Sequence, residues 1–151
     1  MCLLIKDKKA LIAEKDIVCY KKLEECHRAN GENDYVTPYM FSTVDADMIS
    51  GKKTFKAKCF GYGGAHRRKN GVGHIIDEKS MNDNHPEYNY TIESGYIHTY
   101  QDFNAACNGL YKGERIFECI IPKGTKYYAG IFDDGAPSYA SKEIVFKGLV
   151  L

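Results

Sequence analysis

The sequence predicts an α+β domain built mainly from antiparallel sheet. We expect a strongly curved or barrel-like sheet of about eight strands and one amphipathic helix at about residues 99–112. Short runs of β-branched and aromatic residues recur along the chain, turn signals separate them, and only one segment has apolar residues three and four apart. A chain of 151 residues has the length of one ordinary domain, so residues 1–151 are expected to fold together.

Four strands are expected in the first part of the chain. Residues 2–6 form a short apolar run, and residues 16–23 (DIVCYKKL) are rich in β-branched and aromatic side chains. Residues 35–41 are expected at a sheet edge, because Pro38 cannot donate a ladder hydrogen bond. Residues 53–60 alternate apolar and basic side chains, which indicates a half-buried strand with a basic outer face.

The middle of the chain is less regular. A long glycine-rich connection is expected over residues 61–73, and an apolar run resumes at residues 72–76. Residues 77–87 are polar and contain Pro86, so we expect an exposed loop there. Residues 88–97 are the next strand candidate.

The predicted helix begins near Thr99. Thr99 and Asp102 have the spacing of a capping box, with Asp in place of the usual Glu or Gln. Gly109 or Gly113 is expected to end the helix. The apolar stripe that supports it consists of Tyr100, Phe103, Ala106, Cys107, Leu110 and Tyr111.

The last third of the chain reads as strands joined by turns. Residues 115–121 lead into Pro122-Lys123-Gly124, for which Pro in the second and Gly in the fourth position favour a type I turn. Residues 125–132 follow as a strand, residues 133–137 as a turn, and residues 143–151 as the closing strand.

Charge is distributed unevenly although the formal net charge is only +1. That small net charge excludes a polyanion binder that works by overall charge alone. No acid occurs between Asp47 and Asp77, whereas the stretch from Asp77 to Glu93 carries five acids and one lysine. The acid-free window holds Lys52, Lys53, Lys56, Lys58, Arg67, Arg68 and Lys69. Either a ligand or mutual neutralisation across a hairpin explains this asymmetry.

The N-terminal sequence and the cysteines indicate a cytoplasmic protein. MCLLIKDKK has too short an apolar core for a signal peptide, and no segment approaches the length of a membrane span. The six cysteines are therefore expected as free thiols in a reducing compartment. No CxxC or CxxH spacing occurs, so we expect no metal and no cofactor.

The glycine-rich connection is the first candidate binding site. Backbone amides of a glycine-rich turn can point together at an anion, and arginine and lysine add charge-assisted hydrogen bonds. The expected ligand-binding residues in it are Tyr62, His66, Arg67, Arg68 and Lys69. The alternative is a hairpin tip that its charges keep in solvent, since the segment matches neither glycine-rich phosphate motif.

Two further positions carry candidate chemistry. His98 and Tyr100 are expected where a strand passes into the helix, close to a helix N-terminus that favours a bound anion, although His98 would equally serve as a packed junction residue. Cys2 becomes the first residue if Met1 is removed, the arrangement of N-terminal nucleophile hydrolases, although ordinary strand packing explains it as well. These residues define the alternative function, a small hydrolase or transferase that uses Cys2 or His98.

Several phrases of the sequence resemble a family of small proteins of gut Bacteroides-type bacteria and their phages that has no established activity. They are MCLLI, EKDIVCYK, GYIHTYQDFNAA, CIIPKGTKYYAG and SYASKEIVF. The resemblance implies a phage or mobile-element setting and transfers no catalytic residue. The acid-free basic window with its glycine and tyrosine residues, and the lack of a coherent catalytic triad, predict non-catalytic binding of an anionic, nucleotide-like small molecule or a host protein. Sequence-specific nucleic-acid binding is not expected, and self-association through tyrosine-rich strands stays open.

Overall fold

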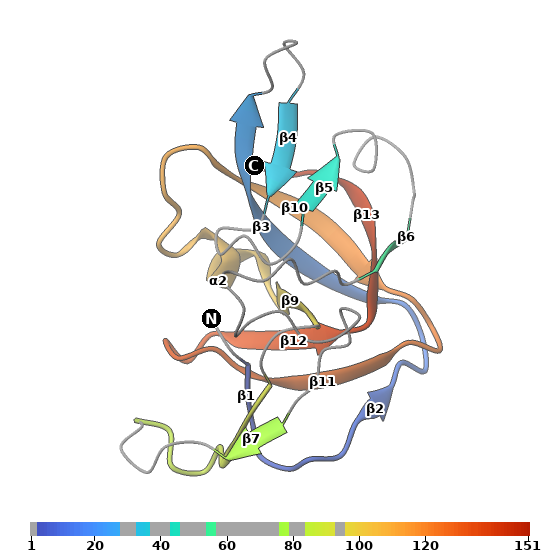
Figure 1. Cartoon of the computed structure of the whole chain (residues 1–151), viewed down its shortest axis with the longest axis vertical. Coiled ribbons are helices and arrows are strands. Elements are labelled where there is room, and N and C mark those ends of the chain that lie inside the picture. The colour runs from blue at the N-terminus through green and yellow to red at the C-terminus, as the bar shows by residue number, and fades with distance from the viewer. Residues whose placement is uncertain are drawn as a thin grey trace, which may run out of the picture.

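The computed structural model describes residues 3–27, 33–36, 43–45, 54–56, 76–78, 84–92 and 96–151. Within these residues thirteen strands join into a single sheet, and a short helix, α2 (Phe103–Cys107), lies against it (Figure 1). The strands are β1 (Leu3–Ile5), β2 (Leu11–Ile12), β3 (Ile17–His27), β4 (Asn33–Val36), β5 (Thr43–Asp45), β6 (Thr54–Lys56), β7 (Ile76–Glu78), β8 (Tyr90–Ile92), β9 (Ile97–Tyr100), β10 (Glu114–Ile121), β11 (Lys126–Ile131), β12 (Pro137–Ser141) and β13 (Glu143–Leu149).

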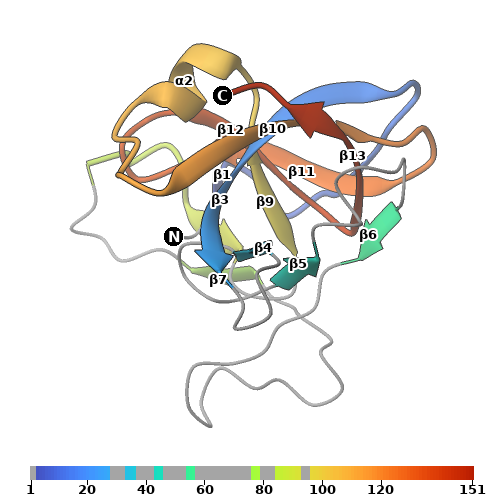
Figure 2. The same ribbon diagram turned by 90° about the horizontal axis from the view of Figure 1, so that it is seen from above.

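The sheet is antiparallel throughout the described part of the chain. Its strands are hydrogen-bonded in the order β6-β13-β10-β3-β9-β12-β11-β1-β8-β7, while β2 pairs with β11, and β4 pairs with both β3 and β5. The two ends of this path, β6 and β7, lie apart in both views, so the sheet is open among these strands (Figures 1 and 2). The predicted α+β class with a mainly antiparallel sheet is confirmed.

Alternation along the strands produces a core on each face of the sheet. In β10, for example, Ile116 packs on one face and Phe117, Cys119 and Ile121 on the other, as a period of two requires. The first core consists of Ala13, Cys19, Leu23, Ile97, Phe117, Cys119, Ile121, Ile144 and Phe146. The second core consists of Leu3, Ile5, Ile92, Tyr100, Ala105, Ala106, Ile116, Tyr128, Phe132 and Ala140. Because Ala105 and Ala106 belong to α2, the helix packs on the face of the second core.

The strands are more numerous than predicted, and several are shorter, although β3 extends beyond its predicted end to His27. The expected strand over residues 88–97 is divided between β8 and β9, which pair with different neighbours, β1 and β12. β12 lies in a segment for which no strand was expected. Proline is a turn signal, yet Pro137 is the first residue of β12. Proline is tolerated at this position of a strand although it has no backbone N–H to donate to the neighbouring strand.

The predicted helix start was wrong. Thr99 does not cap a helix, because it lies in β9 opposite Tyr139 of β12. The N-cap is Asp102, whose carboxylate accepts a hydrogen bond of 2.7 Å from the amide of Ala105. The helix also ends earlier than residue 112, at Cys107: Asn108 is the C-cap, and of the two glycines expected to end the helix it is Gly109 that follows, with φ +65°. The helix begins later than expected because Thr99 and Tyr100, the first residues of its predicted span, belong to β9 and pair with β12.

The turn after β10 also differs from the prediction. The amide of Thr125 donates to the carbonyl of Pro122 over 3.1 Å, so Pro122 is the first residue of the turn. Gly124 is the third, with φ +87°, the conformation that a type II turn requires there. The turn between β11 and β12 lies where predicted, closed by the amide of Gly135 on the carbonyl of Phe132.

Within the described residues, no helix is long and apolar enough to cross a membrane.

Candidate functional site

Most of the sequence-predicted site lies outside the described residues. This applies to the nucleophile candidate Cys2 and to the loop residues Tyr62, His66, Arg67, Arg68 and Lys69. The remaining two predicted residues, His98 and Tyr100, both belong to β9. They alternate with Ile97 and Thr99 along the strand, and His98 lies four positions before the N-cap of α2 rather than beside it.

His98 is partly buried and engaged on both sides of its ring. Nδ1 lies 3.1 Å from the carbonyl oxygen of Tyr96, and Nε2 lies 3.3 Å from that of Ile92. The ring stacks on Phe132 with a centroid separation of 6.2 Å. Burial, and after it the positive charge of Lys21, lowers the pKa of His98 to about 4. At neutral pH the imidazole is therefore uncharged, and only one of its two ring nitrogens can donate a hydrogen bond to the carbonyl oxygen beside it.

Tyr100 is a residue of the second core. Its side chain is buried and meets Phe132 edge-on, with centroids 4.9 Å apart. The ammonium group of Lys22 lies 5.1 Å from the centroid of the Tyr100 ring. The structure thus brings His98 and Tyr100 together through Phe132, as packing partners on one face of the sheet.

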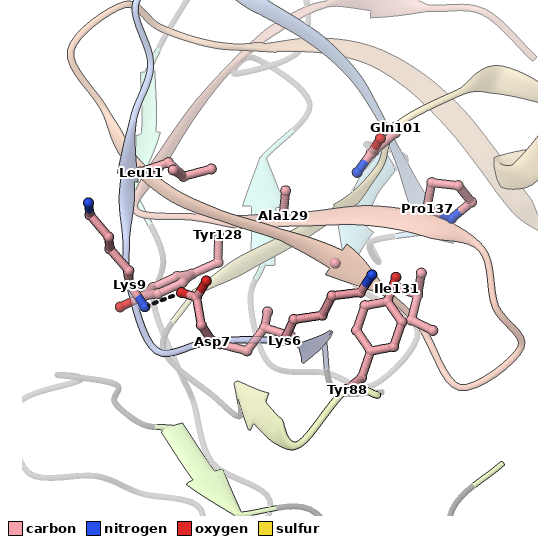
Figure 3. Close-up of a pocket in the computed structure, with 12 residues that line it drawn as sticks. Lys6, Asp7, Lys9, Leu11, Tyr88, Gln101, Tyr128, Ala129, Ile131 and Pro137 are labelled. Atoms are coloured by element: carbon pink, nitrogen blue, oxygen red, sulfur yellow. Dashed lines mark hydrogen bonds between the residues drawn. The ribbon is translucent and has the colours of Figure 1, made fainter. Parts of the chain in front are cut away.

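The described residues also form an open pocket of about 410 Å³, here called the β1–β11 pocket. Its floor is the stretch Ala129 to Ile131 of β11, and the segment from Ile5 to Leu11 between β1 and β2 forms one wall (Figure 3). At Gly130, which also lines the pocket, β11 and β1 approach so closely that any Cβ atom would collide with the carbonyl oxygen of Leu4. Tyr88, Gln101 and Pro137 complete the rim.

The polar groups of this pocket come from distant parts of the chain. Lys6 and Lys9 both line it from the β1–β2 segment. The Lys6 ammonium lies 5.1 Å from the centroid of the Tyr88 ring, whereas the Lys9 side chain extends away from Lys6 in Figure 3. Asp7 lies between the two lysines in Figure 3, where one carboxylate oxygen accepts the amide of Lys9 over 2.7 Å. Gln101 donates its side-chain amide to the carbonyl of Ser138. The lining therefore offers two cations, one carboxylate and an aromatic face.

A second polar group lies inside the first core and is here called the Lys21 cluster. It consists of Lys21 and Cys19 of β3, Thr99 of β9 and Cys119 of β10. Cys19 and Cys119 are directly opposite each other in the β3–β10 register. Tyr20 pairs with Tyr100, which in an antiparallel pair brings Lys21 opposite Thr99. All four side chains are buried, and Lys21 is 7% exposed.

Burial dominates the electrostatics of the Lys21 cluster. It lowers the pKa of Lys21 to about 8, although the neighbouring sulfurs of Cys119 and Cys19 act in the opposite direction. It raises the pKa of Cys19 to about 12 and that of Cys119 well above its usual value, so both thiols are neutral at pH 7. The Lys21 ammonium donates one hydrogen bond, 2.8 Å long, to the carbonyl oxygen of His98.

Sequence reasoning missed both sites for different reasons. Lys21 had a local signal, because a period of two along residues 16–23 aligns it with Ile17, Cys19 and Leu23 on the apolar face of that strand. The β1–β11 pocket had none, since its lining joins positions up to 132 residues apart, from Ile5 to Pro137. Only the pairing of β1 and β12 with β11 brings those positions together.

Among the described side chains, no group of three or more histidine, cysteine, aspartate or glutamate residues is arranged to hold a metal ion. Comparison of the chain with protein-family models, with curated proteins and with solved structures gave no match.

Proposed function

We propose that the protein binds an anionic, nucleotide-like small molecule without catalysing a reaction, and that the β1–β11 pocket receives it. One observation carries this proposal: two lysine side chains and the face of a tyrosine line the same open pocket. Ammonium groups form charge-assisted hydrogen bonds with phosphate or carboxylate, while a tyrosine face accepts a planar ring. The proposed ligand therefore combines a negative charge with a planar ring.

The balance of charge in the pocket supports an anion rather than a cation. Lys6 and Lys9 both line it, and both side chains are exposed enough to reach a ligand. The single carboxylate, Asp7, already accepts the backbone amide of Lys9. The Lys6 ammonium rests over the Tyr88 ring, and an incoming anion can draw it away and leave the ring free for stacking.

The size of the pocket supports a ligand larger than an inorganic ion. Its volume of about 410 Å³ falls within the usual range for small-molecule sites, roughly 300–1,000 Å³. Side chains with apolar surface, including Leu11, Tyr128 and Pro137, line it beside the charged groups. This mixture suits a nucleoside monophosphate better than a free phosphate.

Calorimetric titration tests the proposal, with adenosine monophosphate, adenosine and inorganic phosphate as probes. Lys6→Ala combined with Lys9→Ala should weaken binding of the monophosphate by about tenfold or more, because each lysine supplies a charge-assisted contact. Lys147→Ala is the matched control, since Lys147 is exposed on β13 and does not line the pocket. The control should bind as the wild-type protein does.

Two results would contradict this assignment. If none of the probes binds the wild-type protein, the small-molecule function is wrong. If the Lys6/Lys9 variant binds normally while Arg67→Ala with Arg68→Ala abolishes binding, the ligand occupies the glycine-rich connection instead.

The remaining expectations from the sequence are kept as parts of the same proposal. They are a strongly curved, barrel-like sheet, a cytoplasmic location, a phage or mobile-element setting, and a host protein or a second copy of the chain as further partners. The alternative, catalysis by Cys2 or His98, receives no support from His98, because carbonyl oxygens lie against both nitrogens of its ring.

A further inference from the structure

The buried charge of Lys21 has no counter-charge among the described residues. Its ammonium group has three donors, and the carbonyl oxygen of His98 accepts one of them. Removal of an ammonium ion from water is costly unless an opposite charge or a full set of acceptors replaces the water. The position of Lys21 on the apolar face of β3 therefore requires an explanation.

The neighbouring side chains among the described residues do not supply the missing negative charge. The titratable groups around Lys21 in the described residues are Cys19 on its own strand, Cys119 on β10, His98 on β9 and Tyr139 on β12. The two thiols and the tyrosine have raised pKa values and the histidine a lowered one, so all four are neutral at pH 7. Cys119 Sγ lies 3.7 Å from the carbonyl oxygen of Phe117 and donates to it. From β9 the cluster receives the Thr99 hydroxyl and the carbonyl of His98, which carry no charge.

Thr99 provides a second, independent observation. Its side chain is fully buried, and Oγ1 has no hydrogen-bond partner in the part of the chain that the structure describes. The hydroxyl is near enough to Cys19 to lower the pKa of that thiol, but the two atoms do not reach hydrogen-bond geometry. A buried hydroxyl without a partner is rare in folded proteins, and this one lies opposite the incompletely bonded lysine.

We propose that Lys21 and Thr99 form an internal binding site for one small monovalent anion of about chloride or formate size. The ammonium group supplies the charge, and the hydroxyl and the Cys19 thiol add further donors. The site is separate from the proposed function, because neither Lys21 nor Thr99 lines the β1–β11 pocket.

Burial selects the class of anion. Lys21 is 7% exposed and Thr99 is fully buried, so the site admits only a compact ion. One negative charge neutralises the single ammonium group, whereas a divalent ion would leave an uncompensated charge and lose more hydration energy on entry. Halides and formate satisfy both conditions, whereas gluconate is too large.

Thermal unfolding of the full chain at pH 7 tests the site. Sodium chloride, bromide or formate replaces sodium gluconate at constant ionic strength, so that general screening is unchanged. The melting temperature of the wild-type protein should rise by about 5 °C between 1 and 100 mM anion and level off as the site becomes fully occupied. Equal melting temperatures in chloride, bromide, formate and gluconate would overturn the proposal, leaving a buried water as the partner of these groups.

Variants assign the effect to the cluster. Lys21→Met should remove the anion dependence, and Thr99→Val should weaken it several-fold. Lys22→Met is the matched control, because Lys22 also donates to a backbone carbonyl, that of Asn108, but from the other face of β3. It should keep the full effect, and loss of the effect in this control would contradict the assignment.

If Lys21→Met does not fold, the proposal can still be tested on the wild-type protein. At about pH 9.3 Lys21 is largely neutral, whereas exposed lysines keep their charge. The stabilisation by chloride should then fall at least several-fold. If it persists undiminished at this pH, the anion binds elsewhere.

Discussion

Gly130 determines, at the scale of a single residue, how closely β1 and β11 approach. The carbonyl oxygen of Leu4 occupies the space that a side chain at position 130 would need. Leu4 pairs with Ile131 in the sheet, so the collision would involve backbone that cannot move without disturbing the ladder. The close contact also shapes the floor of the β1–β11 pocket.

Gly130→Ala should therefore destabilise the protein by about 3 kcal/mol, because the methyl group forces two paired strands apart. Urea unfolding followed by circular dichroism measures the change. Gly109→Ala is the control, since Gly109 has φ +65° but no other group lies within 4 Å of the place that its Cβ atom would take. It should cost only about 1 kcal/mol of backbone strain. Equal losses in the two variants would show that contact with Leu4 is not the cause.

The helix α2 shows, at the scale of an element, how packing and capping stabilise a segment that is too short to be stable alone. It has five residues, fewer than an isolated helix needs in water. Ala105 and Ala106 are buried against the sheet, and Phe103 meets Tyr20 edge-on with centroids 5.8 Å apart. Asp102 satisfies the amide of Ala105 at the first turn.

Asp102→Ala should lower the free energy of unfolding by about 1 kcal/mol, because the Ala105 amide loses its acceptor. Urea unfolding measures the loss, and faster hydrogen exchange at the Ala105 amide should accompany it. Asp102→Asn keeps a capping oxygen and should retain most of the stability. A loss as large in the Asn variant would indicate that charge, rather than the cap, is responsible.

Stability of the whole molecule should depend on pH through the two displaced pKa values. The pKa of His98 is about 4 in the folded protein and 6.5 ordinarily, so between these values the unfolded chain binds more protons. Stability is then lost as pH falls from 6.5 to 4. The pKa of Lys21 is about 8 instead of 10.5, so stability should increase as pH rises from 8 towards 10.5.

Urea unfolding between pH 4 and pH 10 measures how the free energy of unfolding changes with pH in both ranges. His98→Gln should reduce the loss of unfolding free energy between pH 6.5 and pH 4 by up to about 2 kcal/mol, after allowance for the partial exposure of the ring. Lys21→Met should reduce the gain of unfolding free energy between pH 8 and pH 10 by up to about 3 kcal/mol. Unchanged slopes in these variants would assign the pH dependence to other groups.

Particular residues show how far the sequence could predict this structure. The strands β3, β10, β11 and β13 were expected within a few residues, because their β-branched and aromatic runs are long. β12 was missed because Pro137 reads as a turn residue, and Thr99 was assigned to a helix cap because its competing partner, Tyr139, lies forty positions away. The inward position of Lys21 could be predicted from alternation alone, but its lack of a counter-charge could not.

The sequence by itself determined the antiparallel α+β class and most of the long strands, because local alternation and backbone preferences specify these features. Only the tertiary structure decided that His98 and Tyr100 meet at Phe132, that Lys6, Lys9 and Tyr88 share a pocket, and that Lys21 faces two neutral thiols and an unpartnered hydroxyl. The physical reason is that strand order sets these contacts. Pairing between strands far apart in the chain is governed by burial summed over the whole sheet, which no local pattern records.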